Sequence, residues 1–239
     1  MRAETPAPGD RSIEMTTEHV HSGSVGDRPP VVLDQASPRA IEWTAESIAS
    51  GGVVAIPTDT VYGIAASLAR PEALDRIFAI KGRPDRMPLP VLVSSIDALS
   101  HLVRVDDAVL PLFGAFWPGP LTVVLPATAR IPERALGPGG TVGVRLPNHP
   151  IAIEVIEKAG GAVACTSANR TGVEPGHTAA EVATSIGAEL DLILDSGRTP
   201  GGVASTVVAV DGSTLRFIRE GAIPIAEVIR IWDEARLVP

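Results

Sequence analysis

The sequence predicts an α/β or α+β fold in which helices cover an open, twisted, mixed sheet. Short runs rich in β-branched apolar residues, of which residues 52–56 are the clearest, alternate with segments whose apolar residues recur at helical spacing. The alternation ends in two strand-like runs on either side of Asp211-Gly212, which predict a hairpin. Aromatic residues make up only 3% of the chain, so Val, Ile, Leu and Ala must fill the core. These observations predict one sheet in one domain spanning residues 31–239.

The first helix has its own start and stop signals. Ser37 suits the N-cap position and Pro38 the first turn, and Gly51-Gly52 ends the helical spacing of apolar residues. The expected elements before residue 120 are strands at 31–33, 53–57, 61–66 and 89–93 and helices at 38–50, 71–80, 96–102 and 106–116.

The second half of the chain continues the alternation. Thr178 and Glu181 make a capping box at the start of a helix. Residues 127–140 and the glycine-rich stretch 195–202 are expected to be loops. The expected elements after residue 120 are strands at 121–126, 141–146, 162–165, 191–194, 205–210 and 215–218 and helices at 150–159, 179–186 and 224–235.

Composition narrows the class of protein. The 239 residues carry a formal net charge of −8, so the overall field repels nucleic acid. Cys165 is the only cysteine, which excludes an intramolecular disulfide, and no Cys/His cluster has zinc-site spacing. No signal peptide or membrane span is evident, and we expect a cytoplasmic protein. Residues 1–30 lack apolar periodicity and are expected to form a disordered extension.

Polar side chains gather where the strand at 53–57 ends. The run from Thr58 to Gly63 presents two threonine hydroxyls, the carboxylate of Asp59 and the only tyrosine, Tyr62. Open α/β sheets bind ligands at the carboxyl ends of their strands, which makes this run a candidate site. Asp59 fits a general base and an Asx turn equally well. Tyr62 is expected to pack rather than to stack on a base.

A basic hexapeptide, residues 81–86, follows the helix at 71–80. Lys81 and Arg83 are two positions apart, so in an extended segment both point the same way, as an anion site requires. Arg145 and Arg219 each come at the end of an apolar strand. A lone arginine is most often a surface residue, but four such basic positions in an acidic protein indicate a basic pocket.

Further candidates follow the strand at 162–165. Ser167 and Asn169 make either a small anion receptor or a plain turn. Cys165 is expected to be a small buried hydrophobe. The phosphate-binding P-loop, the dinucleotide fingerprint, the hydrolase elbow and the kinase signature are all absent from the sequence. A bound nucleotide would therefore be held by side chains and turn amides.

Seven motifs occur in the order found in the YrdC-like family, threonylcarbamoyl-AMP synthases of the tRNA t6A37 pathway, and the resemblance runs from about residue 31 to 231. The motifs are Pro57-Thr58-Asp59-Thr60-Val61-Tyr62-Gly63, Lys81-Gly82-Arg83-Pro84, Trp117-Pro118-Gly119-Pro120-Leu121-Thr122, Val144-Arg145-Leu146-Pro147, Ser167-Ala168-Asn169, Ser205-Thr206-Val207-Val208 and Arg219-Glu220-Gly221.

The resemblance implies a YrdC-like sheet with a basic concave cavity and a nucleotidyltransferase that converts L-threonine, bicarbonate or CO2, and ATP to threonylcarbamoyl-AMP and pyrophosphate. It implies that Mg2+ arrives with ATP, that the chain itself supplies no metal ligand, and that the product passes to a separate tRNA threonylcarbamoyltransferase complex. Stable direct binding of nucleic acid is not expected. The implied site residues are Lys81 and Arg83 for catalysis, Thr60, Arg145 and Ser205 for L-threonine, and Lys81, Arg83, Thr141, Cys165, Ser167, Asn169 and Arg219 for ATP.

The chain departs from the family pattern at three places. Met87 stands where some relatives have Asn, and Leu92 where some have His. We do not expect the second domain of longer relatives in this chain. Two other functions remain open: an RNA-binding module that uses the basic cavity for tRNA or double-stranded RNA, and a carbamoyl-adenylating enzyme of the hydrogenase-maturation type.

Overall fold

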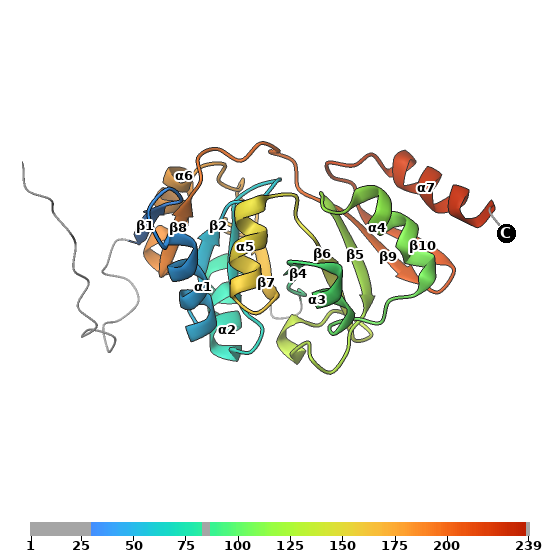
Figure 1. Cartoon of the computed structure of the whole chain (residues 1–239), viewed down its shortest axis with the longest axis horizontal. Coiled ribbons are helices and arrows are strands. Elements are labelled where there is room, and N and C mark those ends of the chain that lie inside the picture. Colours follow the sequence, from blue (N-terminus) through green and yellow to red (C-terminus); the bar gives the residue numbers. More distant parts are fainter. Residues whose placement is uncertain (1–29, 83–86, 238–239) are drawn as a thin grey trace, which may run out of the picture.

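A computed structural model describes residues 30–82 and 87–237 of the chain. Within these residues the strands form one mixed sheet that runs the length of the molecule (Figure 1). The expectation of disorder in residues 1–30 falls, except for Pro30, outside the described residues. The strands are β1 Val31–Asp34, β2 Val54–Ile56, β3 Gly63–Ser67, β4 Val91–Val93, β5 Leu121–Pro126, β6 Thr141–Arg145, β7 Ala162–Ser167, β8 Leu192–Asp195, β9 Thr206–Asp211 and β10 Thr214–Arg219.

The sheet has ten strands in the order β1-β8-β2-β3-β7-β4-β6-β5-β9-β10. The pairs β1–β8, β2–β8, β4–β6 and β5–β9 are parallel. The other neighbours, including the predicted β9–β10 hairpin, are antiparallel. The predicted open mixed sheet is therefore confirmed, and the large number of crossovers brings together residues that lie far apart in the sequence.

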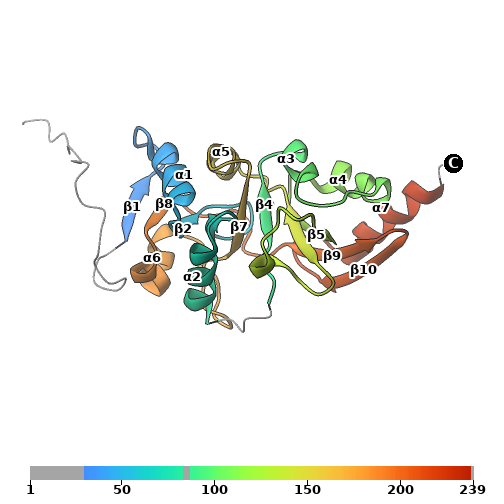
Figure 2. The same ribbon diagram turned by 90° about the horizontal axis from the view of Figure 1, so that it is seen from below.

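Helices cover both faces of the first half of the sheet. In Figure 2, α1 and α5 lie on one face and α2 and α6 on the other. Apolar side chains of α1 and α5 pack with β2, β7 and β8 in a smaller core. The larger core includes α2 and α6 and lies on the other face of the sheet, from β8 to β9. The helices are α1 Ala40–Ser50, α2 Pro71–Lys81, α3 Ile96–Ser100, α4 Leu110–Phe116, α5 Pro150–Lys158, α6 Ala179–Ile186 and α7 Ile225–Leu237.

Two of the predicted helix-end signals are confirmed and one is wrong. Gly51 ends α1 in the left-handed conformation, and the Thr178 hydroxyl accepts a hydrogen bond from the Glu181 amide, as the sequence predicts. The expected N-cap at Ser37 is wrong. A turn closed by Asp34, whose carbonyl accepts from the Ser37 amide, occupies that position, and α1 begins only after Arg39.

Side chains along β5 alternate between the larger core and the opposite face of the sheet. Leu121, Val123 and Leu125 are almost fully buried in the larger core. Thr122 and Val124 point the other way, into a hollow. The same two-residue period in β6 turns Gly143 and Arg145 toward that hollow. None of the helices in the described part of the chain has the length and apolar character needed to cross a membrane.

Candidate active site

A cavity of about 260 Å3 lies on the face of the sheet opposite the larger core. Its walls come from the loop after β2, from the strands β3 to β7, β9 and β10, and from the segments that precede β4 and β9. The lining residues are Thr58, Thr60, Val61, Tyr62, Gly63, Pro88, Pro90, Leu92, Thr122, Val124, Gly143, Arg145, Cys165, Thr166, Ser167, Ala204, Ser205, Val207, Ile218 and Arg219.

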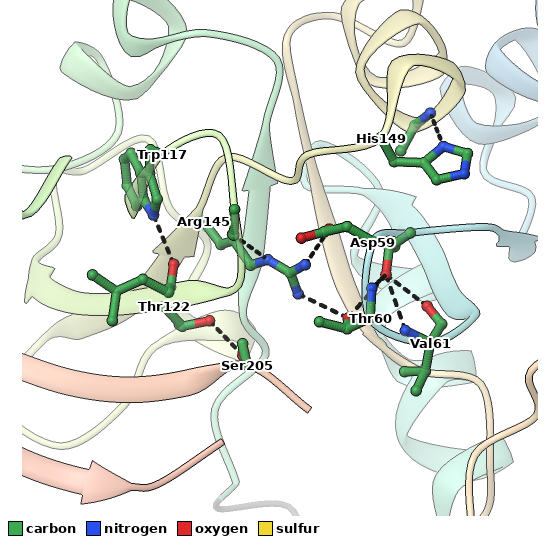
Figure 3. Close-up of polar contacts among 12 residues, drawn as sticks. Asp59, Thr60, Val61, Trp117, Thr122, Arg145, His149 and Ser205 are labelled. Atoms are coloured by element: carbon green, nitrogen blue, oxygen red, sulfur yellow. Dashed lines mark hydrogen bonds and ion pairs between the residues drawn. The ribbon is translucent and has the colours of Figure 1, made fainter. Parts of the chain in front are cut away.

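Arg145 crosses from β6 to the loop that carries Asp59 and Thr60 (Figure 3). Its guanidinium donates to the Gly119 carbonyl over 3.0 Å, to Thr60 Oγ1 over 3.1 Å and to Asp59 Oδ1. Burial lowers the pKa of Arg145, and the charge of Asp59 opposes that shift. The guanidinium has five N–H donors, so donors remain for an anion in the cavity. Asp59 is thus the ion-pair partner of Arg145.

Thr58 shapes the loop beside Arg145. Its hydroxyl lies 3.0 Å from Thr60 Oγ1 and donates to the Val61 carbonyl over 2.6 Å. The amides of Thr60 and Val61 both donate to the Thr58 hydroxyl oxygen. The loop is therefore a closed turn that points the Thr60 hydroxyl into the cavity.

Ser205 and Arg219 form the opposite wall. Arg219 Nη2 donates to the Ser205 carbonyl over 2.9 Å, and Ser205 Oγ lies 2.9 Å from Thr122 Oγ1. Arg219 is exposed, although partial burial of its guanidinium lowers its pKa. Thr122 belongs to the motif that begins at Trp117 but had no predicted role in the site, and the two-residue period of β5 is what turns it toward the cavity.

Lys81 is the last residue of α2 and therefore does not belong to an extended segment. Its ammonium donates to the Ser167 carbonyl over 2.7 Å, to Ser167 Oγ over 3.1 Å and to Asn169 Oδ1 over 2.8 Å. The side chain of Lys81 is buried, and it holds together two residues that were predicted to bind ATP. Arg83 lies outside the described residues.

Cys165 forms part of the cavity floor. Burial raises the pKa of its thiol to about 12, so the sulfur stays protonated at neutral pH. A Cβ atom at Gly63 would meet Cys165 Sγ at 2.6 Å, which explains the need for glycine opposite the thiol. The expectation of a small buried hydrophobe is confirmed.

Three more residues singled out in the sequence are Thr141, Leu92 and Met87. Thr141 does not line the cavity; Gly137 packs between it and Pro88, which does. Leu92 lines the cavity with an apolar side chain, whereas Met87 is exposed.

Tyr62 is fully buried and donates to the Gly197 carbonyl over 2.8 Å, as packing predicts.

No group of three or more His, Cys, Asp or Glu side chains in the described ranges could hold a metal ion.

The Sua5/YciO/YrdC family model, described as telomere recombination, matches residues 46–221. The chain belongs to the Sua5/YciO/YrdC family.

Members of the Sua5/YciO/YrdC family match over most of this chain. A threonylcarbamoyl-AMP synthase of Pyrococcus abyssi is 36% identical over 206 residues, which cover 84% of this chain but only 61% of the relative. A putative threonylcarbamoyl-AMP synthase of Mycobacterium tuberculosis is 36% identical over 203 residues, which cover 83% of this chain and 93% of the relative.

A solved structure has the same fold. The crystal structure of Pyrococcus abyssi Sua5 complexed with L-threonine superposes with a TM-score of 0.79 and 34% identity, over 84% of this chain and 60% of that one. The YrdC-like fold implied by the sequence motifs is thereby confirmed.

Proposed function

We propose that this chain is an L-threonylcarbamoyladenylate synthase, a nucleotidyltransferase of the t6A pathway. It would convert L-threonine, bicarbonate or CO2, and ATP to threonylcarbamoyl-AMP and pyrophosphate. Family membership and two relatives of that name support the proposal. The observation that carries it is the convergence of Thr60, Arg145 and Ser205 on one cavity whose walls also include Ser167 and Arg219.

The Arg145 side of the cavity suits L-threonine. Arginine binds carboxylates through parallel N–H donors, and Arg145 keeps donors that its protein partners do not use. Thr60 Oγ1 and Ser205 Oγ add neutral hydrogen-bonding groups for the amino and hydroxyl groups of the substrate. A relative of known structure was solved with L-threonine, which agrees with this assignment.

The remaining polar and basic groups of the cavity suit ATP. Arg219 and Ser167 line the cavity, and Lys81 and Asn169 lie directly behind Ser167. Arg83 and Thr141 complete the proposed ATP-binding set, with Lys81 and Arg83 as the catalytic cations. ATP enters as its Mg2+ complex, since a cation that bridges phosphates keeps most of its waters and needs few protein ligands.

The chemistry needs positioning and charge neutralisation rather than a protein nucleophile. The threonine amine adds to CO2 and loses a proton, which gives a carbamate. A carbamate oxygen then attacks the α-phosphorus of ATP, and pyrophosphate leaves with its bonding electron pair. Cys165 takes no part as a nucleophile because its thiol is protonated.

Pyrophosphate release tests the proposal. Purified protein is incubated with MgATP and bicarbonate, with and without L-threonine, and release that requires both threonine and bicarbonate is expected. Release with carbamoyl phosphate instead would place the chain among carbamoyl-adenylating enzymes. Folded protein that releases nothing but binds tRNA in a salt-sensitive manner would favour the RNA-binding function.

We further propose that the protein works in the cytoplasm and hands its product to a separate tRNA threonylcarbamoyltransferase complex. An acyl-adenylate is reactive toward water, so direct transfer to a second enzyme would protect it. The formation of t6A by this chain together with such a complex, tRNA and the substrates tests this step.

A further inference from the structure

The carboxylate of Asp59 lies beside the Arg145 guanidinium (Figure 3), and Asp59 is not one of the residues that line the cavity. The side chains of Asp59 and Arg145 are only 10% and 7% exposed. Asp59 Oδ1 accepts from Arg145 Nη2, whereas Oδ2 is buried and has no hydrogen-bond partner among the described residues. The negative charge of Asp59 is therefore balanced by Arg145 rather than by a network of neutral donors.

Stability alone does not explain this arrangement. A buried ion pair is often no more stabilising than well-packed apolar side chains of the same volume, and an unpartnered carboxylate oxygen adds a desolvation penalty. Burial lowers the pKa of the nearby His149, although the charge of Asp59 opposes this, so burial disfavours an imidazolium as a second partner for the carboxylate. A charged pair at this position thus points to a role in the cavity.

Arg219, on the other wall, is held differently. Its guanidinium contacts the carbonyl and hydroxyl oxygens of Ser205, which are neutral. No carboxylate lies within ion-pair distance of it in the part of the chain that the structure describes. One wall of the cavity therefore carries a neutralised arginine and the other a positive charge without a carboxylate partner.

We propose that Asp59 is a specificity-determining positioning residue: it orients and neutralises Arg145, so that this wall accepts the zwitterionic α-amino acid and rejects the nucleotide polyphosphate. A zwitterion has no net charge and binds to a neutral ion pair through oriented hydrogen bonds. A polyphosphate binds in proportion to the local positive charge and is directed to Arg219. The inference rests on the proposed function, because it assigns the walls to L-threonine and ATP.

Binding of L-threonine in the presence of inorganic tripolyphosphate tests the inference by calorimetry. In the wild-type protein, saturating tripolyphosphate should leave the Kd for L-threonine within about twofold of its value without the anion. In Asp59→Asn, which keeps the shape and removes the charge, tripolyphosphate should reach Arg145 as well. It should then weaken L-threonine binding about tenfold, a coupling of ordinary size between two sites.

Two further variants make the test specific. Asp59→Glu keeps the charge and should bind both ligands independently, as the wild type does. Asp191→Asn breaks the Arg76–Asp191 ion pair of 2.8 Å, which lies outside the cavity lining, and should also behave as the wild type. An Asp59 that merely stabilised the fold would lower the stability of Asp59→Asn without creating competition between the two ligands.

Several outcomes would overturn the inference. Independent binding in folded Asp59→Asn would do so, and so would mutual exclusion in the wild type, which needs no variant to fold. Asp59→Ser replaces Asp59→Asn if the latter does not fold. A wild-type protein without threonine-dependent pyrophosphate release would refute the proposed function itself, whereas an active wild type with an unchanged Asp59→Asn would refute only the role of Asp59.

Discussion

Arg145 and Arg219 line the same cavity but differ in their surroundings. Arg145 is buried, bound to a carboxylate and anchored at each of its three nitrogens. Arg219 is exposed and makes its contacts with Ser205 alone. Burial lowers the pKa of both side chains, yet only Arg145 has an anion to offset that cost. The same residue type can therefore serve as a rigid, neutralised element on one wall and as an available positive charge on the other.

The largest expected effect is that of Arg145→Ala. Removal of the guanidinium leaves the buried carboxylate of Asp59 without its partner, which should cost about 3–5 kcal/mol of stability. Threonine-dependent pyrophosphate release should also disappear. Urea unfolding and the pyrophosphate assay measure the two effects. A variant that kept wild-type stability would show that Asp59 is not held as an ion pair.

Arg219→Ala should separate activity from stability. Its two hydrogen bonds to Ser205 are worth about 0.5–1.5 kcal/mol each, and exposure of the side chain reduces this, so the free energy of unfolding should fall by about 1–2 kcal/mol at most. The KM for ATP should rise about 10- to 100-fold, as expected when a charge-assisted hydrogen bond of about 1.5–3 kcal/mol to a phosphate is lost. Steady-state kinetics with varied ATP provide the check. A change in the KM for threonine of equal size would contradict the division between the two walls.

Gly201→Ala should disturb the Arg145 wall indirectly. A Cβ at this position would meet the Asp59 carbonyl at 2.6 Å and the Thr60 Cα at 2.8 Å, so the loop must move. We expect a loss of about 1–3 kcal/mol and weaker L-threonine binding, with ATP binding less affected. The matched control is Gly114→Ala in α4, where a Cβ meets nothing within 4 Å and should stabilise the helix by about 0.5–1 kcal/mol. Equal effects at both glycines would refute the proposed contact.

The smallest effect concerns Cys165. Burial raises the pKa of the thiol from 9.0 to about 12, and the charge of Arg145 opposes this only in part. Above about pH 9 the unfolded chain loses this proton while the folded chain keeps it, so stability falls as pH rises toward 12. Between about pH 8 and pH 10 the wild type should lose about 1 kcal/mol more than Cys165→Ala in urea unfolding. Equal losses would indicate a thiol that ionises normally.

The succession of strands and helices was predictable from apolar periodicity, but some element ends were not. The strand expected at 61–66 begins only at Gly63, because the Thr58 hydroxyl binds the amide and carbonyl of Val61 and closes a turn. Conversely, β7 continues through Ser167, which pairs with Gly63 of β3. The end of β7 is set by pairing with a strand more than one hundred positions away, and the local sequence does not show that pairing.

The site was predictable one motif at a time. The motifs after β2 and at the ends of β6 and β7 are visible as polar groups that follow apolar runs, and the family resemblance added residue roles. The contacts between motifs were not visible. Asp59 and Arg145 are 86 positions apart, and Thr122 and Ser205 are 83 apart. The hydrogen bonds from Lys81 to Ser167 and Asn169 likewise depend on where α2 ends relative to β7.

The position of β8 between β1 and β2 has a consequence for biosynthesis. The strand β1, the first in the described part of the chain, gains its partner only after residue 195 has left the ribosome, and the cavity needs β10, which ends at Arg219. Such distant pairings must close large loops before any contact rewards them, so this part of the sheet forms late. A nascent chain thus leaves β1 and one edge of β2 unpaired until β8 has emerged, although β2 can already pair with β3.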